Sequence, residues 1–149
     1  MRIEEKRGEP GLVSMLSQLS KALNRRASEE LLGMRLKPYM VLGYIREHPG
    51  ATQQELENVL FMDANGVVIL LNELEAAGHS MRRRDPQDRR RHIVELTAAG
   101  RHALERADKA RESLEGEMLA GLTAEERATL RRLVHRVLET LSQPAAARA

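Results

Sequence analysis

Apolar residues recur at every third or fourth position through most of this chain, the spacing of helices with one buried face. Residues 10–32 carry a leucine-rich stripe and are followed by Gly33, which predicts a long first helix with a glycine stop. Pro38 favours the start of a second helix, because its missing N–H group is not needed in the first turn. The sequence His-Pro-Gly at 48–50 predicts the end of that helix.

Polar capping residues predict the starts of the remaining helices. A threonine or aspartate before a helix accepts a hydrogen bond from a free N–H group of the first turn, and a glutamate three residues later can return one. The capping residues and the helices they begin are Thr52 with Glu55 for 52–60, Asp63 for 64–78, Thr97 for 98 to about 120, and Thr123 with Glu126 for 124–142.

One short region has the pattern of a β-hairpin. Residues 79–84 and 91–96 are the expected strands, and Asp-Pro-Gln-Asp at 85–88 is typical of a turn. Two short helices followed at once by a hairpin are the layout of a winged helix-turn-helix. We therefore predict a mainly α fold with a small β-hairpin wing, in one domain of 149 residues.

Composition narrows the possible classes of protein. Aromatic residues make up 2% of the chain, and its abundant Leu, Ala, Glu and Arg are typical of helices. There is no cysteine, which excludes disulfides, thiolate catalysis and cysteine-based zinc sites. The charged N-terminus does not resemble a signal peptide, and the longest apolar run, Val-Val-Ile-Leu-Leu, is far short of a membrane span. We expect a soluble cytoplasmic protein.

The sequence has no constellation for catalysis, a cofactor or a metal ion. Its five histidines are scattered without a metal-binding spacing. There is no glycine-rich phosphate loop and no plausible arrangement of serine, histidine and aspartate for nucleophilic catalysis. We expect neither an enzyme nor a cofactor-binding protein.

Basic charge is concentrated in the predicted hairpin. The net charge of the chain is +2, but residues 82–92 hold six arginines and two aspartates, a local charge of +4. A local basic cluster on an otherwise nearly neutral chain favours a polyanionic partner, most often nucleic acid. The alternative is a solvated loop that only aids solubility.

The stretch RRRDPQDRRRHIVELTAAG, with Asp-Pro, Asp-Arg-Arg, Leu-Thr and a glycine three residues later, resembles the wing of the MarR family of bacterial transcription regulators. NELEAAG also resembles the end of that family's recognition helix. The resemblance implies an obligate homodimer, with residues 10–33 and 98–142 as the dimerisation region and 36–97 as the winged lobe. It further implies that two lobes straddle a pseudo-palindromic operator in double-stranded DNA, and that a small phenolic or aromatic acid releases the DNA.

The resemblance also assigns roles to the wing residues. Asp85 is expected to pair with Arg89 across the hairpin, and Arg90 matches the residue that usually contacts DNA. A hairpin tip is narrow enough for the minor groove, where the negative potential favours arginine, while arginines lower on the strands meet phosphates. The remaining arginines are expected to contact phosphates (Arg84 and Arg91), or only to support the hairpin or stay in solvent (Arg82 or Arg83).

The helix predicted at 64–78 departs from the family on its outer face. Asn65, Ile69 and Asn72 lie on that face with Glu73 at its edge, and the family often has arginine at the second and fourth of these positions. Asparagine can hold adenine by two hydrogen bonds and isoleucine can contact a thymine methyl group, so we expect an A/T-leaning half-site. The residues expected on the opposite, core face are Val67, Leu70, Leu71, Leu74 and Ala77.

A second departure follows the recognition helix. Relatives usually place apolar residues where His79 and Ser80 stand. We therefore expect the first wing strand to pack poorly or to tilt.

Arg26 lies on the apolar stripe of the first helix, where an unpaired charge would be costly to bury. One candidate partner is Glu30, one turn later, or an acid of the other subunit. The other is the carboxylate of an effector, which arginine binds by two parallel hydrogen bonds. In this second interpretation Tyr39 and Tyr44 are among the polar groups of the ligand site, whose place between the first helix and the lobe follows from the resemblance.

Two other functions remain open from the sequence. The uncharged face of Asn65, Ile69 and Asn72 is compatible with a degenerate helix-turn-helix that serves as a protein-interaction module. A ligand-blind architectural DNA binder would carry the same wing. The sequence favours a homodimeric DNA-binding regulator, a repressor relieved by a small acid.

Overall fold

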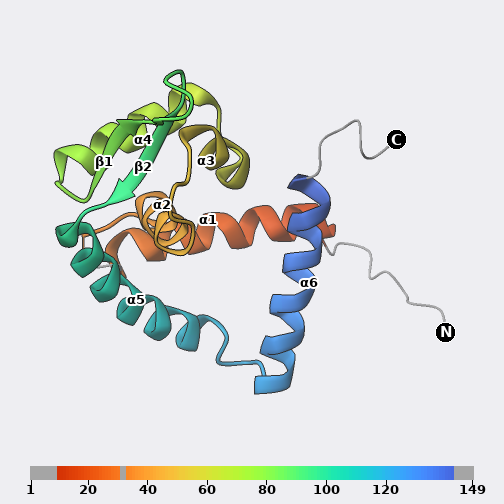
Figure 1. Ribbon diagram of the computed structural model, residues 1–149. Helices are drawn as coiled ribbons and strands as arrows, with labels where there is room; N and C mark the ends of the chain where they lie inside the picture. Colours follow the sequence, from red (N-terminus) through yellow and green to blue (C-terminus); the bar gives the residue numbers. More distant parts are fainter. Residues whose placement is uncertain (1–9, 31–32, 143–149) are drawn as a thin grey trace.

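The computed structural model describes residues 10–30 and 33–142, with the backbone alone for residues 28–30. Over these residues the chain is mainly helical and has one antiparallel two-stranded wing, as predicted (Figure 1). The elements are α1 (Leu12–Glu30), α2 (Leu36–Glu47), α3 (Gln53–Leu60), α4 (Ala64–Ala76), β1 (Ser80–Arg84), β2 (His92–Leu96), α5 (Ala98–Met118) and α6 (Ala124–Ser142).

The hydrophobic core lies inside a lobe formed by α2, α3, α4 and the wing, with α1 and α5 packed against it (Figure 1). Each large aliphatic side chain removed from water here contributes roughly 1.5–3 kcal/mol to folding. The most deeply buried of them come from every element of the lobe and from α5, namely Val41, Leu42, Leu56, Val67, Leu71, Val94 and Leu104.

The predicted N-caps all form, because each depends only on neighbouring residues. At Thr123 the bond is returned: its N–H donates to the Glu126 carboxylate at 2.9 Å, which completes a capping box and lowers the pKa of Glu126. The capping side chains and the N–H groups that donate to them are Thr52 and Glu55 (3.1 Å), Asp63 and Gly66 (2.7 Å), Thr97 and Gly100 (2.9 Å), and Thr123 and Glu126 (3.1 Å).

The start of the second helix differs from the prediction. α2 begins at Leu36 rather than at Pro38, with Arg35 as an N-cap that makes no side-chain bond. Pro38 still lies in the first turn, where no N–H group has a partner within the helix. The proline therefore predicted the first turn correctly, but not the residue at which the helix begins. Residues 31–32, where the first helix was predicted to end, lie outside the described residues.

α4 buries the face that its spacing predicted, with one exception. Ala77 is exposed, so its place on the core face was wrong. The helix ends at Ala76, and Gly78 turns the chain into the left-handed region at φ 77°, so Ala77 lies beyond the last turn that faces the core. The predicted core residues that are buried are Val67, Leu70, Leu71 and Leu74.

The wing is regular over its whole length. β1 and β2 pair without a break from Ser80 with Leu96 to Arg84 with His92, and the expected poor packing or tilt of the first strand stays a prediction. The departure at Ser80 has a direct consequence. Its side chain is buried, and its hydroxyl has no hydrogen-bond partner within the described part of the chain.

The base of the wing is fixed to the start of α5. The Thr97 N–H donates to the His79 carbonyl at 3.1 Å, and the Thr97 hydroxyl donates to the Gly78 carbonyl at 2.6 Å. At Gly100 an added β-carbon would lie 2.0 Å from the His79 carbonyl oxygen, so only glycine allows this approach. The wing and the start of α5 therefore form one unit.

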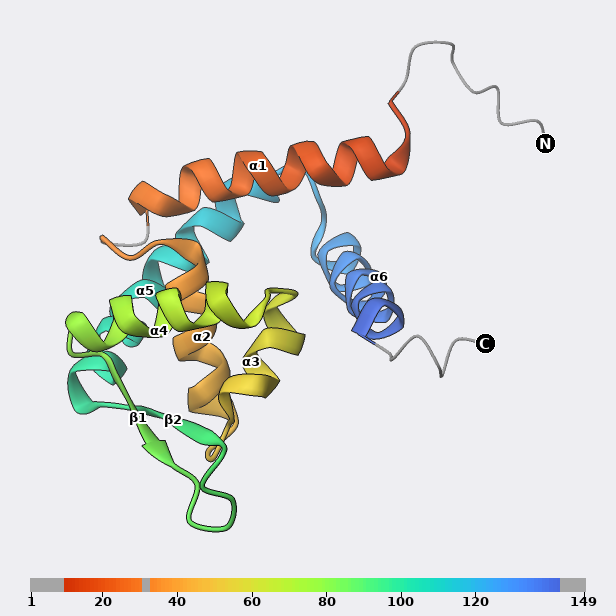
Figure 2. The same ribbon diagram turned by 90° about the horizontal axis from the view of Figure 1, so that it is seen from above.

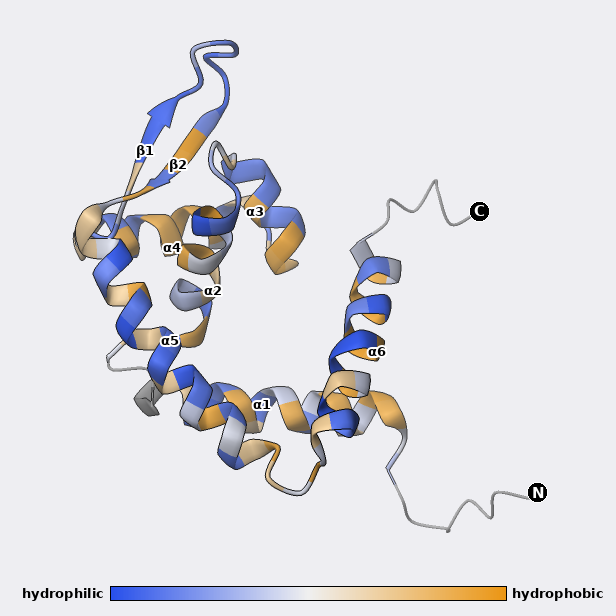
Figure 3. Ribbon diagram, turned by 60° about the horizontal axis from the view of Figure 1, so that its bottom comes forward, coloured by the Kyte–Doolittle hydropathy of each residue, from blue (hydrophilic) through white to orange (hydrophobic). Residues whose placement is uncertain are grey.

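α6 stands apart from the lobe in two perpendicular views (Figures 1 and 2). None of its residues is buried within the described chain, and Figure 3 shows apolar residues along it. Large apolar side chains are exposed on both terminal helices, at Leu12, Val13, Met15, Leu16 and Leu19 of α1 and at Leu130, Leu133, Val134, Val137, Leu138 and Leu141 of α6.

Candidate nucleic-acid interface

The outer face of α4 carries uncharged, exposed side chains. The hairpin loop protrudes from the same lobe (Figure 2). Asn65, Ile69 and Asn72 are all exposed, as the helical spacing predicted. Ile69 is 61% exposed, so this isoleucine has no role in the core. At the edge of the face, the Glu73 carboxylate pairs with Arg35. The helix therefore offers two amides and one apolar side chain to a partner.

Arg82 of β1 reaches across to α4. Its Nε and Nη2 donate to the two carboxylate oxygens of Glu75 at 2.7 and 3.0 Å, and Nη2 also donates to the Asn72 side-chain oxygen. The hydrogen bonds from Arg82 lower the pKa of Glu75 below its ordinary value. Arg83 pairs with Glu95 across the hairpin. Both arginines support the wing, as expected for one or other of them.

The turn of the wing is closed by its two aspartates. The Asp85 carboxylate accepts from the Gln87 N–H at 2.9 Å, and the Asp88 carboxylate accepts from the Arg90 N–H at 3.1 Å. Asp88 also pairs with the side chains of Arg90 and Arg91, at 3.4 and 3.5 Å. Such short side-chain bonds to the backbone two residues later are the usual role of aspartate in turns.

The expected ion pair between Asp85 and Arg89 does not form in the described wing, and that assignment is corrected. The physical reason is local: the Asp85 carboxylate is turned toward the backbone of the loop that it closes. The ion pairs of the loop go to Asp88 instead. Asp85 remains a support of the wing, through a different contact.

Four wing arginines are available to a partner molecule. The side chain of Arg90 is 93% exposed and that of Arg91 is 58% exposed, and among the described residues each forms an ion pair with the nearby Asp88 alone. Arg84 and Arg89 are exposed, and neither has an ion pair within the described residues. Basic charge therefore projects from the loop and the open end of the hairpin.

The three residues predicted to bind an effector are not brought together. Arg26 pairs with Glu117 of α5 at 2.6 Å, and its side chain is 56% exposed rather than buried on an apolar stripe. The Tyr39 hydroxyl donates to Asp108 at 2.6 Å, in the middle of the same helix. The Tyr44 hydroxyl donates to Glu55 of α3 at 3.1 Å. The side chain of Glu30, the alternative partner of Arg26, lies outside the described residues.

The contact of Tyr39 is part of a polar cluster between α2 and α5 that the sequence did not indicate. Asp108 accepts from Tyr39 and from Arg46 Nη1, each at 2.6 Å, and Arg111 lies 4.0 Å away. Burial and the bond to Asp108 raise the pKa of Tyr39 to about 12. Although burial alone would raise it, the hydrogen bonds from Arg46 and Tyr39 hold the pKa of Asp108 below its ordinary value. The cluster ties the lobe to α5.

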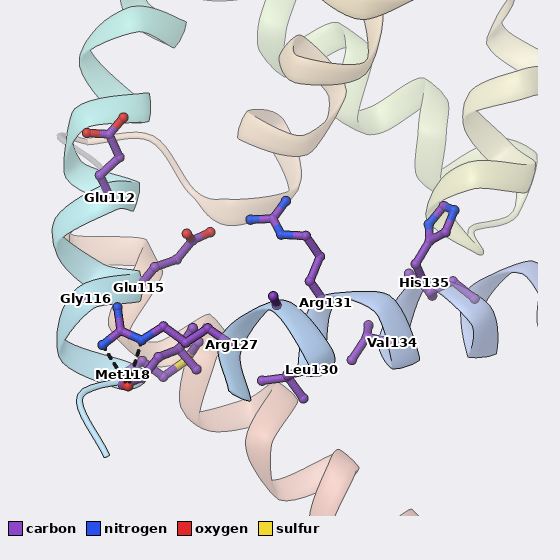
Figure 4. A pocket seen from close by; sticks show the side chains of 12 residues that line it. Glu112, Glu115, Gly116, Met118, Arg127, Leu130, Arg131, Val134 and His135 are labelled. Carbon is purple, nitrogen blue, oxygen red and sulfur yellow. Dashed lines mark hydrogen bonds between the residues drawn. The ribbon is translucent and has the colours of Figure 1, made fainter. Parts of the chain in front are cut away.

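A cavity of about 600 Å³ lies between the end of α5 and α6 (Figure 4). Arg127 closes one end, where its Nη2 donates to the Leu119 carbonyl at 2.9 Å. Leu130 and Val134 of α6 contribute apolar side chains to the lining. Ionisable side chains line it as well, namely Glu112, Glu115, Arg131 and His135, so the hollow is of mixed character.

Other kinds of site find no support in the described part of the chain. No three His, Asp or Glu side chains gather there as they would around a metal ion. Across the same residues, no helix is both long and apolar enough to cross a membrane.

Residues 32–91, which include the helix-turn-helix and most of the wing, match the sequence profile of the MarR family. The transcriptional regulator HosA of Escherichia coli is 30% identical over 125 residues, which are 84% of this chain and 93% of that protein. The chain belongs to the MarR family.

The likeness to other MarR-family proteins extends to their structures. A mutant MarR of Escherichia coli complexed with operator DNA superposes with a TM-score of 0.76 at 30% identity, covering 85% of this chain and 93% of that one. An uncharacterized HTH-type regulator of Bacillus subtilis, YdgJ, is 39% identical over 79 residues, 53% of this chain. The matched stretch spans about half of that relative, 48% of its length. The family to which the chain belongs is one of DNA-binding transcriptional regulators rather than enzymes.

Proposed function

We propose that this regulator binds a pseudo-palindromic operator as a homodimer, represses transcription there, and releases the DNA when a small aromatic or phenolic acid binds. The DNA-binding part of this proposal rests on one observation: an open, uncharged face of α4 lies beside a wing that carries four exposed arginines. An E. coli MarR of the same fold is found with operator DNA, which supports the same use of this surface.

The proposed contacts divide between the two grooves. α4 enters the major groove, where Asn65, Ile69 and Asn72 meet base edges. Arg90, whose side chain is 93% exposed, inserts into the minor groove, which attracts arginine where it is narrow. The neighbouring arginines that neutralise phosphates are Arg84, Arg89 and Arg91.

The homodimer is proposed from the exposed apolar faces of α1 and α6. A helix with apolar residues along it and none of them buried is not stable in water by itself, and a second copy can cover it. A two-fold dimer places the two lobes on half-sites about one DNA turn apart. The cavity between α5 and α6 would then receive a helix of the partner subunit.

The effector part of the proposal rests on Arg26 alone, because the Tyr39 and Tyr44 hydroxyls donate to Asp108 and Glu55 elsewhere in the fold. An aromatic acid would replace Glu117 on the Arg26 guanidinium and bind between α1 and the lobe. Calorimetric titration of a panel of aromatic acids tests this. Arg26→Ala should lose binding while DNA affinity is kept, and Glu117→Gln, which removes the competing carboxylate, should bind at least as tightly as wild type. Equal binding by Arg26→Ala and wild type would remove Arg26 from the site.

Selection of bound DNA from a random pool tests the central proposal. A two-fold symmetric enriched motif is expected, with two half-sites and an A/T-leaning content. A protein-interaction module would enrich no motif. An architectural binder would enrich bent or A/T-rich DNA without two-fold symmetry. Either result would contradict the operator proposal.

A further inference from the structure

Asn72 differs from the other two residues of the α4 face, because its side chain is held by another element. The Asn72 carboxamide oxygen accepts a hydrogen bond from Nη2 of Arg82, which comes from β1. For Asn65 and Ile69 the described residues provide no comparable side-chain bond. Arginine has donors and no acceptor, so the carboxamide must turn its oxygen to the guanidinium and its NH2 group away.

The guanidinium that holds Asn72 is itself fixed in place. Two parallel hydrogen bonds, at 2.7 and 3.0 Å, join it to Glu75, one turn after Asn72 on α4. The Arg82 side chain is 21% exposed and that of Glu75 is 31% exposed, so the pair is partly shielded from water. A planar guanidinium bound at two points cannot swing, and its third contact therefore has a fixed position.

We propose that Arg82 is a positioning residue for base recognition: it holds the carboxamide of Asn72 so that its NH2 group, rather than its oxygen, faces the major groove. This inference rests on the proposed binding of α4 to operator DNA. An asparagine that pairs with adenine must both donate to N7 and accept from N6, whereas a donor alone selects an acceptor edge such as guanine N7 and O6 or thymine O4. The Asn72 position of each half-site should therefore disfavour adenine.

Arg82 does not act as one of the DNA-contacting arginines in this arrangement. Its charge is matched by Glu75, and its donors are used inside the lobe. Arg83, its neighbour on β1, pairs with Glu95 of β2 and has no bond to α4 in the described structure. Arg83 is therefore a matched control, since it carries the same charge on the same strand.

The experiment is selection from a random DNA pool with wild type, Asn72→Ala, Arg82→Met, Arg83→Met and the double variant Asn72→Ala with Arg82→Met. Asn72→Ala identifies the base pair that Asn72 contacts, as the position whose preference it relaxes. At that position Arg82→Met should shift the preference toward adenine by about tenfold, because the freed oxygen can then accept from N6. Arg83→Met should keep the wild-type motif.

The double variant should resemble Asn72→Ala alone at this position, because Arg82 acts only through Asn72. Thermal unfolding followed by circular dichroism checks that each variant folds. If Arg82→Met folds poorly, Glu75→Gln provides the same test, since it releases the guanidinium and should shift the preference in the same direction. NMR of the free protein adds a readout without DNA: the two amide protons of Asn72 should move in Arg82→Met and not in Arg83→Met.

The outcomes distinguish failure of the positioning role from failure of the proposed operator binding on which it rests. A wild-type motif with an unchanged preference in both Arg82→Met and Glu75→Gln would overturn the positioning role and leave operator binding intact. A shift at a base pair other than the one relaxed by Asn72→Ala would also overturn it. If wild type itself enriches no motif, operator binding fails, and the positioning role fails with it.

Discussion

Ser80 is a polar residue at a position that the fold buries. Its hydroxyl lies at the base of the wing with no hydrogen-bond partner among the described residues. A buried hydroxyl left without a partner costs about 1–3 kcal/mol. Ser80→Ala should therefore raise the free energy of unfolding by about 1 kcal/mol, because it removes the hydroxyl and leaves only a small void. Urea denaturation at a fixed protein concentration measures the change, and a lower stability of the variant would show that the hydroxyl is satisfied in solution.

Two glycines with opposite surroundings give a second test at the scale of single residues. At Gly100 a methyl group would meet the His79 carbonyl, so Gly100→Ala should lower the free energy of unfolding by about 2–3 kcal/mol. Gly43 lies within α2 with no atom near an added β-carbon, so Gly43→Ala should raise it by about 0.5–1 kcal/mol. Thermal unfolding of both variants checks this, and similar effects of the two substitutions would contradict the close contact at the wing base.

At the scale of elements, the wing should contribute strongly to DNA affinity. Arg90→Ala should weaken operator binding by about 1–3 kcal/mol and make the dependence on salt less steep, because fewer counterions are released. Arg83→Ala is the control, since this arginine is bound to Glu95 within the hairpin. Fluorescence anisotropy over a range of salt concentrations measures both. Wild-type affinity in Arg90→Ala would remove this arginine from the interface.

The polar cluster between α2 and α5 should make stability depend on pH at both extremes. The pKa of Asp108 is lowered in the folded state, so its contribution is present above the unfolded value near 3.8 and is lost as pH falls through the folded pKa. The pKa of Tyr39 is raised from 10.0 to about 12, so its contribution is present below pH 10 and is lost as pH rises toward 12. The free energy of unfolding should fall in both windows.

Two substitutions assign these windows to their residues. Asp108→Asn should lower the free energy of unfolding at pH 7 by about 1–3 kcal/mol and flatten its acid dependence, because the charge that pairs with Arg46 is lost. Tyr39→Phe should flatten only the alkaline limb. Denaturant unfolding across the pH range provides the measurement, and an alkaline limb that persists in Tyr39→Phe would assign it to other groups.

How far the sequence predicts the structure depends on the distance over which a contact acts. The capping box that Thr123 and Glu126 form at the start of α6 was predicted, because both residues lie within one turn of helix. The pair of Arg26 and Glu117 was not, because its partners are 91 residues apart in sequence and meet only in the folded chain. The wing was predicted as an element, but Asp85 bonds to the backbone of its own turn instead of to Arg89, since the nearer donor prevails.

The candidate site follows the same rule. The exposed face of α4 was predicted from helical spacing alone, as was the clustering of arginine on the wing. The hydrogen bond from Arg82 to Asn72 joins a strand to a helix, so the residue pattern of neither element predicts it. A partial signal was present, since Glu75 follows Asn72 at the spacing of one helical turn and offers an acid to a nearby cation.

At the scale of the whole molecule, folding and association should be inseparable. Val134 lies on the exposed apolar face of α6, and Val134→Asp should raise the dissociation constant of the dimer at least about tenfold, since each dimer would bury two unpaired carboxylates. Arg132→Ala, on the opposite face of α6, is the control and should leave association unchanged. Sedimentation velocity over a range of concentrations measures both, and a stable folded wild-type monomer would contradict the dimer.

The attachment of the wing to α5 has a mechanical consequence. α5 runs for 21 residues, about 31 Å at 1.5 Å per residue, from the base of the wing toward α6. Because the contacts of Thr97 and Gly100 hold the wing to the start of α5, the wing moves together with this helix as one rigid body. If α5 tilts by about 10° about its C-terminal end, the wing at its N-terminal end is displaced by about 5 Å, more than the 3.4 Å rise of one base pair. In the proposed dimer, a change of tilt where α5 meets α6 would therefore move the wing by more than one base-pair step along the DNA.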